Sequence, residues 1–125
     1  MDIAPEHWIL LTLALLFFKH WYIDFVDQSM EEVQGKAIYG NWHGIMHSFK
    51  HGIGTLVVFG LMGESVIGAI ILAVLDGIFH YHIDWAKMNW GNRDIQTPAF
   101  WAHLGLDQYA HQLVYLAMIL LVVGI

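Results

Sequence analysis

Four long apolar stretches, each of about 20 residues, constrain the fold of this chain more than any other feature. They occupy residues 8–26, 43–62, 65–86 and 103–125. A helix of about 20 residues, rising about 1.5 Å per residue, crosses a hydrocarbon core about 30 Å thick. Only 13% of the 125 residues are charged, against roughly 25% in an ordinary soluble domain. The sequence therefore predicts a single all-α transmembrane domain over residues 1–125, folded as a four-helix bundle in a lipid bilayer.

Two polar connections and one short turn join these stretches. Residues 28–42 and 87–102 are polar, and they contain residues that favour turns and end helices: Gly35, Gly40 and Asn41 in the first connection, and Gly91, Asn92 and Pro98 in the second. Gly63 and Glu64 form a connection so short that it indicates a tight helical hairpin. The helices are therefore expected to run up-down-up-down. The segment before the first stretch carries Asp2 and Glu6 and no basic residue, so we expect no cleavable secretory signal.

The polar residues of the four stretches gather at one predicted end of the bundle. They lie at the C-terminal ends of the first and third stretches and at the N-terminal ends of the second and fourth, which the alternating order brings to the same side. All the basic residues belong to this side, at Lys19, Lys36, Lys50, Lys87 and Arg93. The positive-inside rule then predicts a protein of the cytoplasmic (inner) membrane, with the polar end toward the cytoplasm and both termini outside.

Composition narrows the chemistry that the polar end can support. Cysteine is absent, which excludes disulfides, thiolate metal sites, iron–sulfur clusters and cysteine nucleophiles. The formal charge is −6, and the chain has only five basic residues, which argues against a nucleic-acid partner. Nine histidines remain, a high number for a chain of this length.

Histidine and aspartate recur at intervals of four residues in every stretch. Residues four apart lie on one face of a helix, about 6 Å from each other along its axis. The stripes are His20, Asp24 and Gln28 in the first stretch, His43, His47 and His51 in the second, Asp76, His80 and Asp84 in the third, and His103, Asp107 and His111 in the fourth. The alternation of the helices predicts that the four stripes converge inside the bundle.

Antiparallel neighbours allow the stripes to be stacked into three layers. The deepest layer would hold His20, His51, Asp76 and His111, the middle layer Asp24, His47, His80 and Asp107, and the shallowest Gln28, His43, Asp84 and His103. If one helix were shifted by a turn relative to its neighbours, the residues in each layer would change, but the four stripes would still converge.

This set of imidazoles and carboxylates predicts a divalent metal site. Zn²⁺, Fe²⁺ and Mn²⁺ accept these ligands, and ionisable groups at membrane depth usually face the interior, where they pair or bind. All the histidines and aspartates of the stripes are candidate ligands, and the first choices are Asp24, His47, His80, Asp107 and His111. The other members would form a second site or orient the ligating imidazoles, and Asp84 is the candidate general base.

The stripes are also consistent with arrangements that hold no divalent metal ion. A polar network can hold membrane helices together without any ligand. A chain of ionisable groups can carry protons or ions, although the other half of the predicted bundle lacks polar residues for a continuous path. A bis-histidine haem site needs apolar space, and the many aspartates argue against it. His7 and His82 fall off the stripes, and Lys50 is expected to extend toward the headgroups.

Several of these motifs, taken in order, resemble a known family. They are His20-x-x-x-Asp24-Phe25-x-x-Gln28, the downstream Lys36, His43-x-x-x-His47, His80-x-x-x-Asp84-x-x-Lys87 and Asp107-Gln108-x-x-His111. The set resembles the domain of unknown function 3307 family, small membrane proteins of bacteria and phages. The resemblance implies four membrane helices with a shared histidine and aspartate core, and no established activity. Its layout is similar to that of membrane proteins described as metal-dependent hydrolases. His51, Asp76 and His103 lie outside these motifs.

Two classes of function follow from these expectations. An enzyme would use the metal to activate water against a lipid-linked or amphipathic substrate. An anionic group of that substrate would contact the polar residues nearest the mouth of the site, which are Gln28, Lys36, Lys87 and Gln108. An oxygen-activating di-iron site is a variant for which the chain is short. A non-catalytic protein would bind metal or protons, or would serve as a structural subunit of a homo-oligomer or larger membrane assembly.

Overall fold

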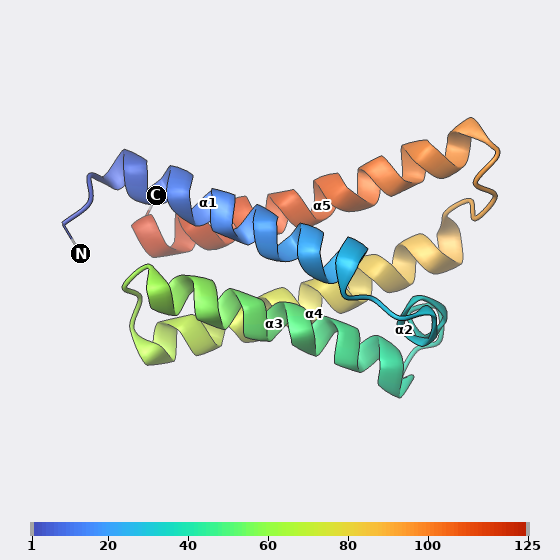
Figure 1. The fold of residues 1–125 in the computed structure, drawn as a ribbon, viewed down its shortest axis with the longest axis horizontal. Helices are drawn as coiled ribbons and strands as arrows, with labels where there is room; N and C mark the ends of the chain where they lie inside the picture. The colour runs from blue at the N-terminus through green and yellow to red at the C-terminus, as the bar shows by residue number, and fades with distance from the viewer. Residues whose placement is uncertain (1, 125) are drawn as a thin grey trace.

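The structure is a computed structural model that describes residues 2–124, and the regular elements of this part of the chain are all helical. They are α1 (Pro5–Trp21), the π-helix η1 (Tyr22–Val26) that continues it, α2 (Met30–Gly35), α3 (Trp42–Leu61), α4 (Val66–Trp90) and α5 (Pro98–Val123) (Figure 1). The all-α prediction is confirmed. The predicted domain ends at residues 1 and 125 lie outside the described residues.

Local sequence signals set the ends of the long helices. Pro5 and Pro98 open α1 and α5, where a missing amide hydrogen breaks no helical hydrogen bond. Ser65 and Thr97 cap α4 and α5, because their side chains accept hydrogen bonds from backbone amides of the first turn. The Thr97 cap starts α5 at residue 98 rather than at the predicted residue 103, and α4 continues to residue 90 rather than 86.

The four long helices lie lengthwise beside one another, and successive ones run in opposite directions (Figure 1). In this view α1 and α5 lie above α3 and α4. Both termini and the α3–α4 turn are at one end of the molecule, whereas α2 and the α4–α5 connection are at the other. Gly63 makes the α3–α4 turn with a φ of 88°, a conformation that glycine adopts without steric cost.

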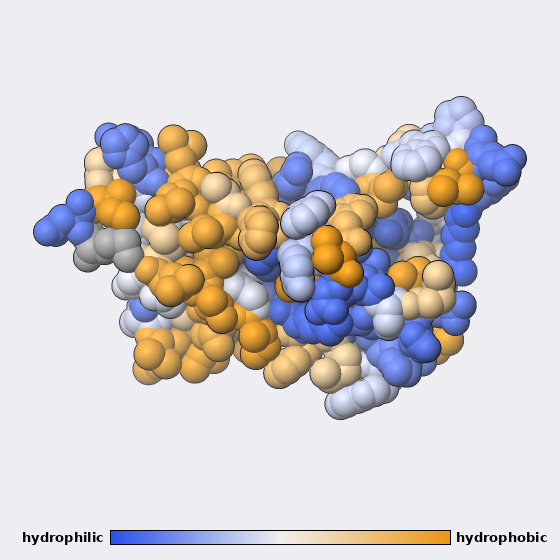
Figure 2. Space-filling model, viewed as in Figure 1, coloured by the Kyte–Doolittle hydropathy of each residue, from blue (hydrophilic) through white to orange (hydrophobic). Residues whose placement is uncertain are grey.

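Three helical segments are long and apolar enough to cross a membrane, namely Pro5–Val26, Val66–Trp90 and Pro98–Val123. α3 is not among them, because its three histidines and Lys50 lower its mean hydropathy. The apolar side chains of the long helices point outward to a large extent. Leu10, Ile67 and Leu121 expose 65%, 73% and 67% of their surfaces, and apolar residues dominate the end of the molecule that holds the termini (Figure 2). Such an exterior is suited to lipid.

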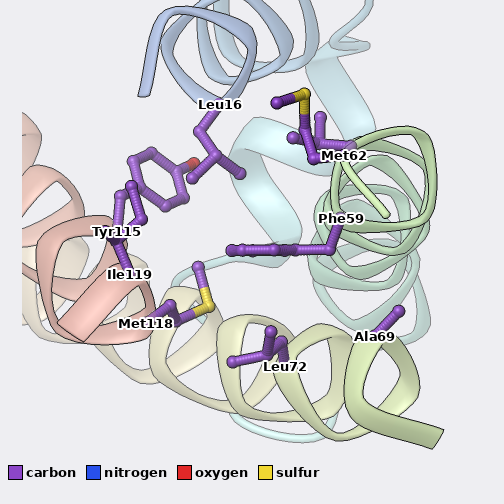
Figure 3. Packing of buried hydrophobic residues seen from close by; sticks show 9 residues of the cluster. Leu16, Phe59, Met62, Ala69, Leu72, Tyr115, Met118 and Ile119 are labelled. Carbon is purple, nitrogen blue, oxygen red and sulfur yellow. The ribbon is translucent and has the colours of Figure 1, made fainter. Parts of the chain in front are cut away.

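An apolar core fills that same end. Leu16 and Phe59 are fully buried, and Leu72, Tyr115 and Met118 lie against them (Figure 3). All four long helices contribute to this core. Its boundary lies at Tyr115, whose ring packs in the core while its hydroxyl meets the first histidine of the polar end.

Candidate functional site

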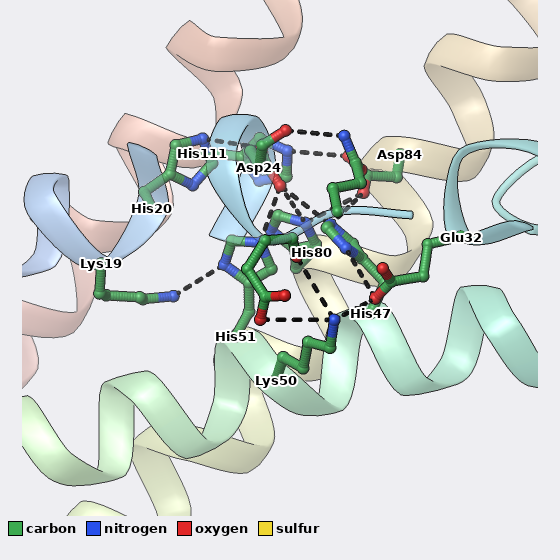
Figure 4. Close-up of polar contacts among 12 residues, drawn as sticks. Lys19, His20, Asp24, Glu32, His47, Lys50, His51, His80, Asp84 and His111 are labelled. Atoms are coloured by element: carbon green, nitrogen blue, oxygen red, sulfur yellow. Dashed lines mark hydrogen bonds and ion pairs between the residues drawn. The ribbon is translucent and has the colours of Figure 1, made fainter. Parts of the chain in front are cut away.

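Five histidines surround two aspartates in the interior of the polar end, and we call this set the histidine–aspartate cluster. Its members are His20, Asp24, His47, His51, His80, Asp84 and His111 (Figure 4). They come from α1, η1, α3, α4 and α5, and every one of them is buried. The predicted convergence of the four stripes is therefore confirmed.

Asp24 is the aspartate with the most imidazole neighbours. Its Oδ1 lies 2.9 Å from His47 Nε2 and 2.8 Å from His51 Nε2. His80 Nε2 is 3.6 Å from the same oxygen. The other oxygen, Oδ2, lies 3.1 Å from His20 Nε2. One carboxylate thus faces the Nε2 atoms of histidines from three helices.

A π-helical turn positions this carboxylate. Asp24 lies in η1, which the hydrogen bond from the Asp27 amide to the Tyr22 carbonyl closes at 2.8 Å. Single π turns are rare and occur often at functional sites. The sequence stripe of His20, Asp24 and Gln28 gave no sign of the wider turn. Gln28 ends this segment, where its side-chain amide donates to the Asp24 carbonyl at 2.7 Å.

Asp84 is the second centre of the cluster. Its Oδ2 lies 3.0 Å from His80 Nε2 and 3.6 Å from His47 Nε2. Its Oδ1 lies 3.1 Å from His111 Nε2. The Lys36 ammonium is 3.2 Å from Oδ2. The predicted shallow layer is wrong for Asp84, which lies one turn deeper, beside the histidines of the middle layer.

Two atoms at the junction of these groups lack hydrogen-bond partners. His80 Nε2 and Asp84 Oδ2 are buried, and neither makes a hydrogen bond with any of residues 2–124. They lie only 3.0 Å apart, without the alignment that a hydrogen bond requires, and the Lys36 ammonium is 3.2 Å from the Asp84 oxygen. A buried polar atom without a partner is costly, and a metal ion at this point would satisfy His80 Nε2.

The donor atoms form two overlapping groups with the spacing of metal ligands. The first comprises Asp24, His47, His51 and His80, and the second comprises His80, Asp84 and His111. Within each group the ligand atoms all lie within 4.8 Å of one another. His80 belongs to both groups, so the two are parts of one site. Nitrogen and oxygen donors in such a set suit Zn²⁺, Fe²⁺ or Mn²⁺.

A surrounding set of polar groups orients the imidazoles. His20 lies 2.8 Å from the Tyr115 hydroxyl through Nδ1 and 2.6 Å from Gln108 Oε1 through Nε2. The Gln108 amide donates to Asp107 Oδ2 at 2.9 Å, and Asp107 Oδ1 is 3.3 Å from His111 Nε2. Partners of this kind fix the orientation of ligating histidines in metal sites.

Asp76 does not join the cluster as predicted, because Lys19 neutralises it. The Lys19 ammonium donates to Asp76 Oδ2 at 2.8 Å and lies 3.0 Å from His51 Nδ1. The Thr55 hydroxyl also donates to Asp76 Oδ2. Gly54 gives the lysine room, since a Cβ at this position would lie 2.9 Å from Lys19 Cδ. Lys19 and Asp76 thus form a buried ion pair on the inner side of the cluster.

Two predicted ligands lie outside the cluster. His43 is exposed in the first turn of α3. His103 is half-buried at the α4–α5 connection, where its Nδ1 accepts a hydrogen bond from the Asn92 amide at 2.7 Å. Both residues lie beyond the point at which the helices converge. His82 lies off the stripe, as expected, and contacts the Tyr39 hydroxyl on the exterior.

The helix α2 was absent from the sequence prediction, although its signal is readable. Ser29 and Glu32 form a capping box, in which the Ser29 side chain accepts from the Glu32 amide and the Glu32 side chain accepts from the Ser29 amide. The helix brings Lys36 to Asp84, and it places Glu32 Oε1 3.7 Å from His47 Nδ1. Polar residues of the connection therefore reach the cluster.

Glu32 is held in its charged form by its neighbours. Burial alone would raise the pKa of Glu32, but hydrogen bonds from the Lys50 ammonium and the Ser29 amide outweigh it, and the pKa is lowered. The Lys50 ammonium lies 2.7 Å from Glu32 Oε1. Lys50 was expected to extend toward the headgroups, and instead it pairs with this helix.

Comparison with known proteins identifies a family and no activity. The model of the family described as "Protein of unknown function (DUF3307)" matches residues 11–125. No curated protein and no solved structure matches the chain.

Proposed function

The chain belongs to the DUF3307 family, and from this premise we propose that it is an integral membrane protein that binds a divalent metal ion in the histidine–aspartate cluster. The observation that carries the proposal is the buried ring of His80, whose two nitrogens both lack a hydrogen-bond partner among residues 2–124 and which lies at the junction of two ligand groups. A fully satisfied polar network would leave no such ring.

The geometry favours a subset of the predicted ligands. Asp24, His47, His80, Asp84 and His111 offer the direct ligand atoms. An ammonium group only donates hydrogen bonds, so the contact with Lys19 makes His51 Nδ1 an acceptor and leaves the proton on Nε2. His51 then donates to Asp24 and orients it. His20 also faces Asp24, and Asp107 faces His111, so both are orienting groups, whereas Asp76 and His103 make other contacts and His43 is exposed.

A metal-dependent hydrolase is the enzyme class that this centre fits best. A bound divalent ion lowers the pKa of water and polarises a phosphoryl or acyl oxygen. Within the chain, the Asp84 oxygen that does not bind the ion can take up a proton, as a general base requires. Lys36, 3.2 Å from that carboxylate, can hold an anionic group of the substrate.

We further propose that all four long helices cross the cytoplasmic membrane, with the cluster toward the cytoplasm and both termini outside. α3 carries His47 and His51 on the face that α1, α4 and α5 cover, so it need not expose these two histidines to lipid. A tag at the C-terminus should then be labelled by impermeant reagents added to intact cells. Labelling only after the membrane is permeabilised would show that the orientation is opposite to the one proposed.

Elemental analysis of protein purified in a mild detergent tests the metal proposal. Wild-type protein should contain zinc, manganese or iron in a fixed ratio to the chain, and His80→Ala should lose it. His43→Ala is the matched control, because His43 lies outside the cluster, and it should keep the metal. Wild type that takes up none of the three metals, while His47→Ala combined with Asp84→Asn folds normally, would overturn the proposal.

A structural polar network is the second candidate, and two buried lysines favour it. Lys19 pairs with Asp76, and Lys36 pairs with Asp84, so the chain itself balances part of the aspartate charge. Such a network would fix the packing of the helices in an oligomer or larger membrane assembly. The same variants separate the two candidates, because a purely structural network predicts altered stability and no bound metal.

A further inference from the structure

A cleft of about 370 Å³ opens between α4 and α5 beside the histidine–aspartate cluster. Figure 1 shows α4 and α5 side by side up to the connection between them. The walls of the cleft are mostly apolar, with Ile83, Ala86, Leu106 and Ala110 among the lining residues, and three polar residues also line it: Lys87, His103 and Asp107. Both helices are long and apolar enough to cross a membrane, and Leu106 in the cleft lining is 63% exposed, so the cleft opens on a surface that lipid would cover.

The inner end of the cleft touches the cluster through Asp107. This residue is 4% exposed, and its Oδ1 lies 3.3 Å from His111 Nε2. Oδ1 makes no hydrogen bond within the described part of the chain. A molecule in the cleft would therefore reach the edge of the proposed metal site.

Lys87 supplies a positive charge at the same depth. Its ammonium lies 3.6 Å from Asp107 Oδ2, too far for a hydrogen bond, while Gln108 donates to that oxygen at 2.9 Å. The Lys87 side chain is 25% exposed, so its donors can reach a ligand. His103 also lines the cleft. Because its Nδ1 accepts from Asn92, its Nε2 carries the proton and is a second donor.

We propose that this cleft binds a lipid phosphate, with the phosphate monoester at Lys87 and the alkyl chain along the apolar walls. A phosphate needs donors and positive charge, and an alkyl chain needs apolar walls that open to the bilayer. The proposal rests on the proposed function, since it names the substrate class of the same site. The larger cleft between α3 and α4, about 590 Å³ in volume, is lined almost entirely by apolar residues and touches no member of the cluster.

Native mass spectrometry of the full chain in a neutral maltoside detergent tests the proposal with lysophosphatidic acid as the probe. Lysophosphatidylcholine with the same chain and inorganic phosphate are the comparison ligands, and both should bind more weakly. Lys87→Gln and Ala110→Phe should each weaken binding of lysophosphatidic acid about tenfold, whereas Lys87→Arg should retain it. Ala117→Phe is the matched control, because it enlarges an exposed residue of α5 that does not line the cleft.

Equal binding of lysophosphatidylcholine, or unchanged binding by Lys87→Gln, would overturn the proposal. If Ala110→Phe fails to fold by circular dichroism, Ala86→Phe fills the cleft from the α4 wall. The metal content of the same samples separates this proposal from the previous one. Wild type without metal that still binds lysophosphatidic acid through Lys87 would refute the metal site and support the lipid-phosphate cleft.

Discussion

At the end of the molecule that holds the termini, Leu16 and Phe59 pack among other apolar side chains. At the opposite end, Asp24 and Asp84 lie among imidazoles and lysines, each atom facing a particular partner. Apolar contacts are non-directional, so a core tolerates exchanges of similar volume. A buried charge tolerates no such exchange, because the loss of one partner strands the other. The two ends should therefore differ in how they respond to single substitutions.

The largest effect is expected from Lys19→Met, which removes one half of the buried ion pair with Asp76. An uncompensated buried charge typically costs about 3–5 kcal/mol, and we expect a loss of that order in the free energy of unfolding, measured by denaturant titration in mixed micelles. Arg93→Met is the control, because Arg93 is exposed, and it should cost less than about 1 kcal/mol.

The double variant with Lys19→Met and Asp76→Leu sharpens this result. Replacing both charges by apolar side chains removes the stranded carboxylate, so most of the lost stability should return. A double variant no more stable than Lys19→Met would show that the ion pair itself is not the cause of the loss.

The next largest effect is expected where α2 packs against α3 at the polar end. A Cβ at Gly44 would lie 2.8 Å from the Gly35 carbonyl oxygen, so Gly44→Ala must push α2 away from α3, at a cost of about 1–3 kcal/mol. Limited proteolysis should cut the displaced connection faster. Gly60→Ala on the same helix meets nothing within 4 Å and should be neutral or slightly stabilising. Equal losses in both variants would show that the contact between α2 and α3 is not the cause.

A smaller effect is expected in the apolar end. Phe59→Leu keeps an apolar side chain in the core and should lower the free energy of unfolding by less than about 1.5 kcal/mol. The histidine–aspartate cluster should be undisturbed, so metal binding should match that of the wild type. A Phe59→Leu protein that unfolds as readily as Lys19→Met would remove the proposed difference between the two ends.

The smallest effect concerns the pH dependence of Glu32. Its folded-state pKa is lowered, so its charged form stabilises the fold above its ordinary pKa, and this contribution disappears as the pH falls through the folded-state pKa. The difference in free energy of unfolding between wild type and Glu32→Gln should be at most about 1 kcal/mol near neutral pH and should vanish in acid. The exposed neighbour Glu31 provides the control variant Glu31→Gln. A difference that grows in acid would contradict the sign.

The sequence predicted the convergence of the stripes because the four-residue spacing and the alternation of helix direction are both local properties. It could not predict which aspartate each imidazole faces. Asp76 was assigned to the deepest layer of the site, but the neighbouring Lys19 reaches it through the space that Gly54 leaves. Such a pairing depends on how closely α1 approaches α3, and no periodicity in the sequence encodes that distance.

The helix ends explain where the predicted and observed sites differ most. His43 and His103 continue their stripes in sequence, yet they lie where the helices have already separated. The capping box at Ser29 and Glu32 was readable, but a helix of only six residues has no amphipathic period to support it. The π-helical turn at Asp24 follows from tertiary packing and has no sequence signal of its own.

The two polar connections look alike in sequence, yet they differ in how much inserted chain they should accept. In the first, Glu32, Gly35 and Lys36 are buried against the bundle, so extra residues there would displace charges from the cluster. In the second, residues 92–96 are exposed, and exposed loop tips generally accept insertions. A reporter domain can therefore be placed between Asp94 and Ile95, which gives an engineer one permissive loop on the face that carries the cluster.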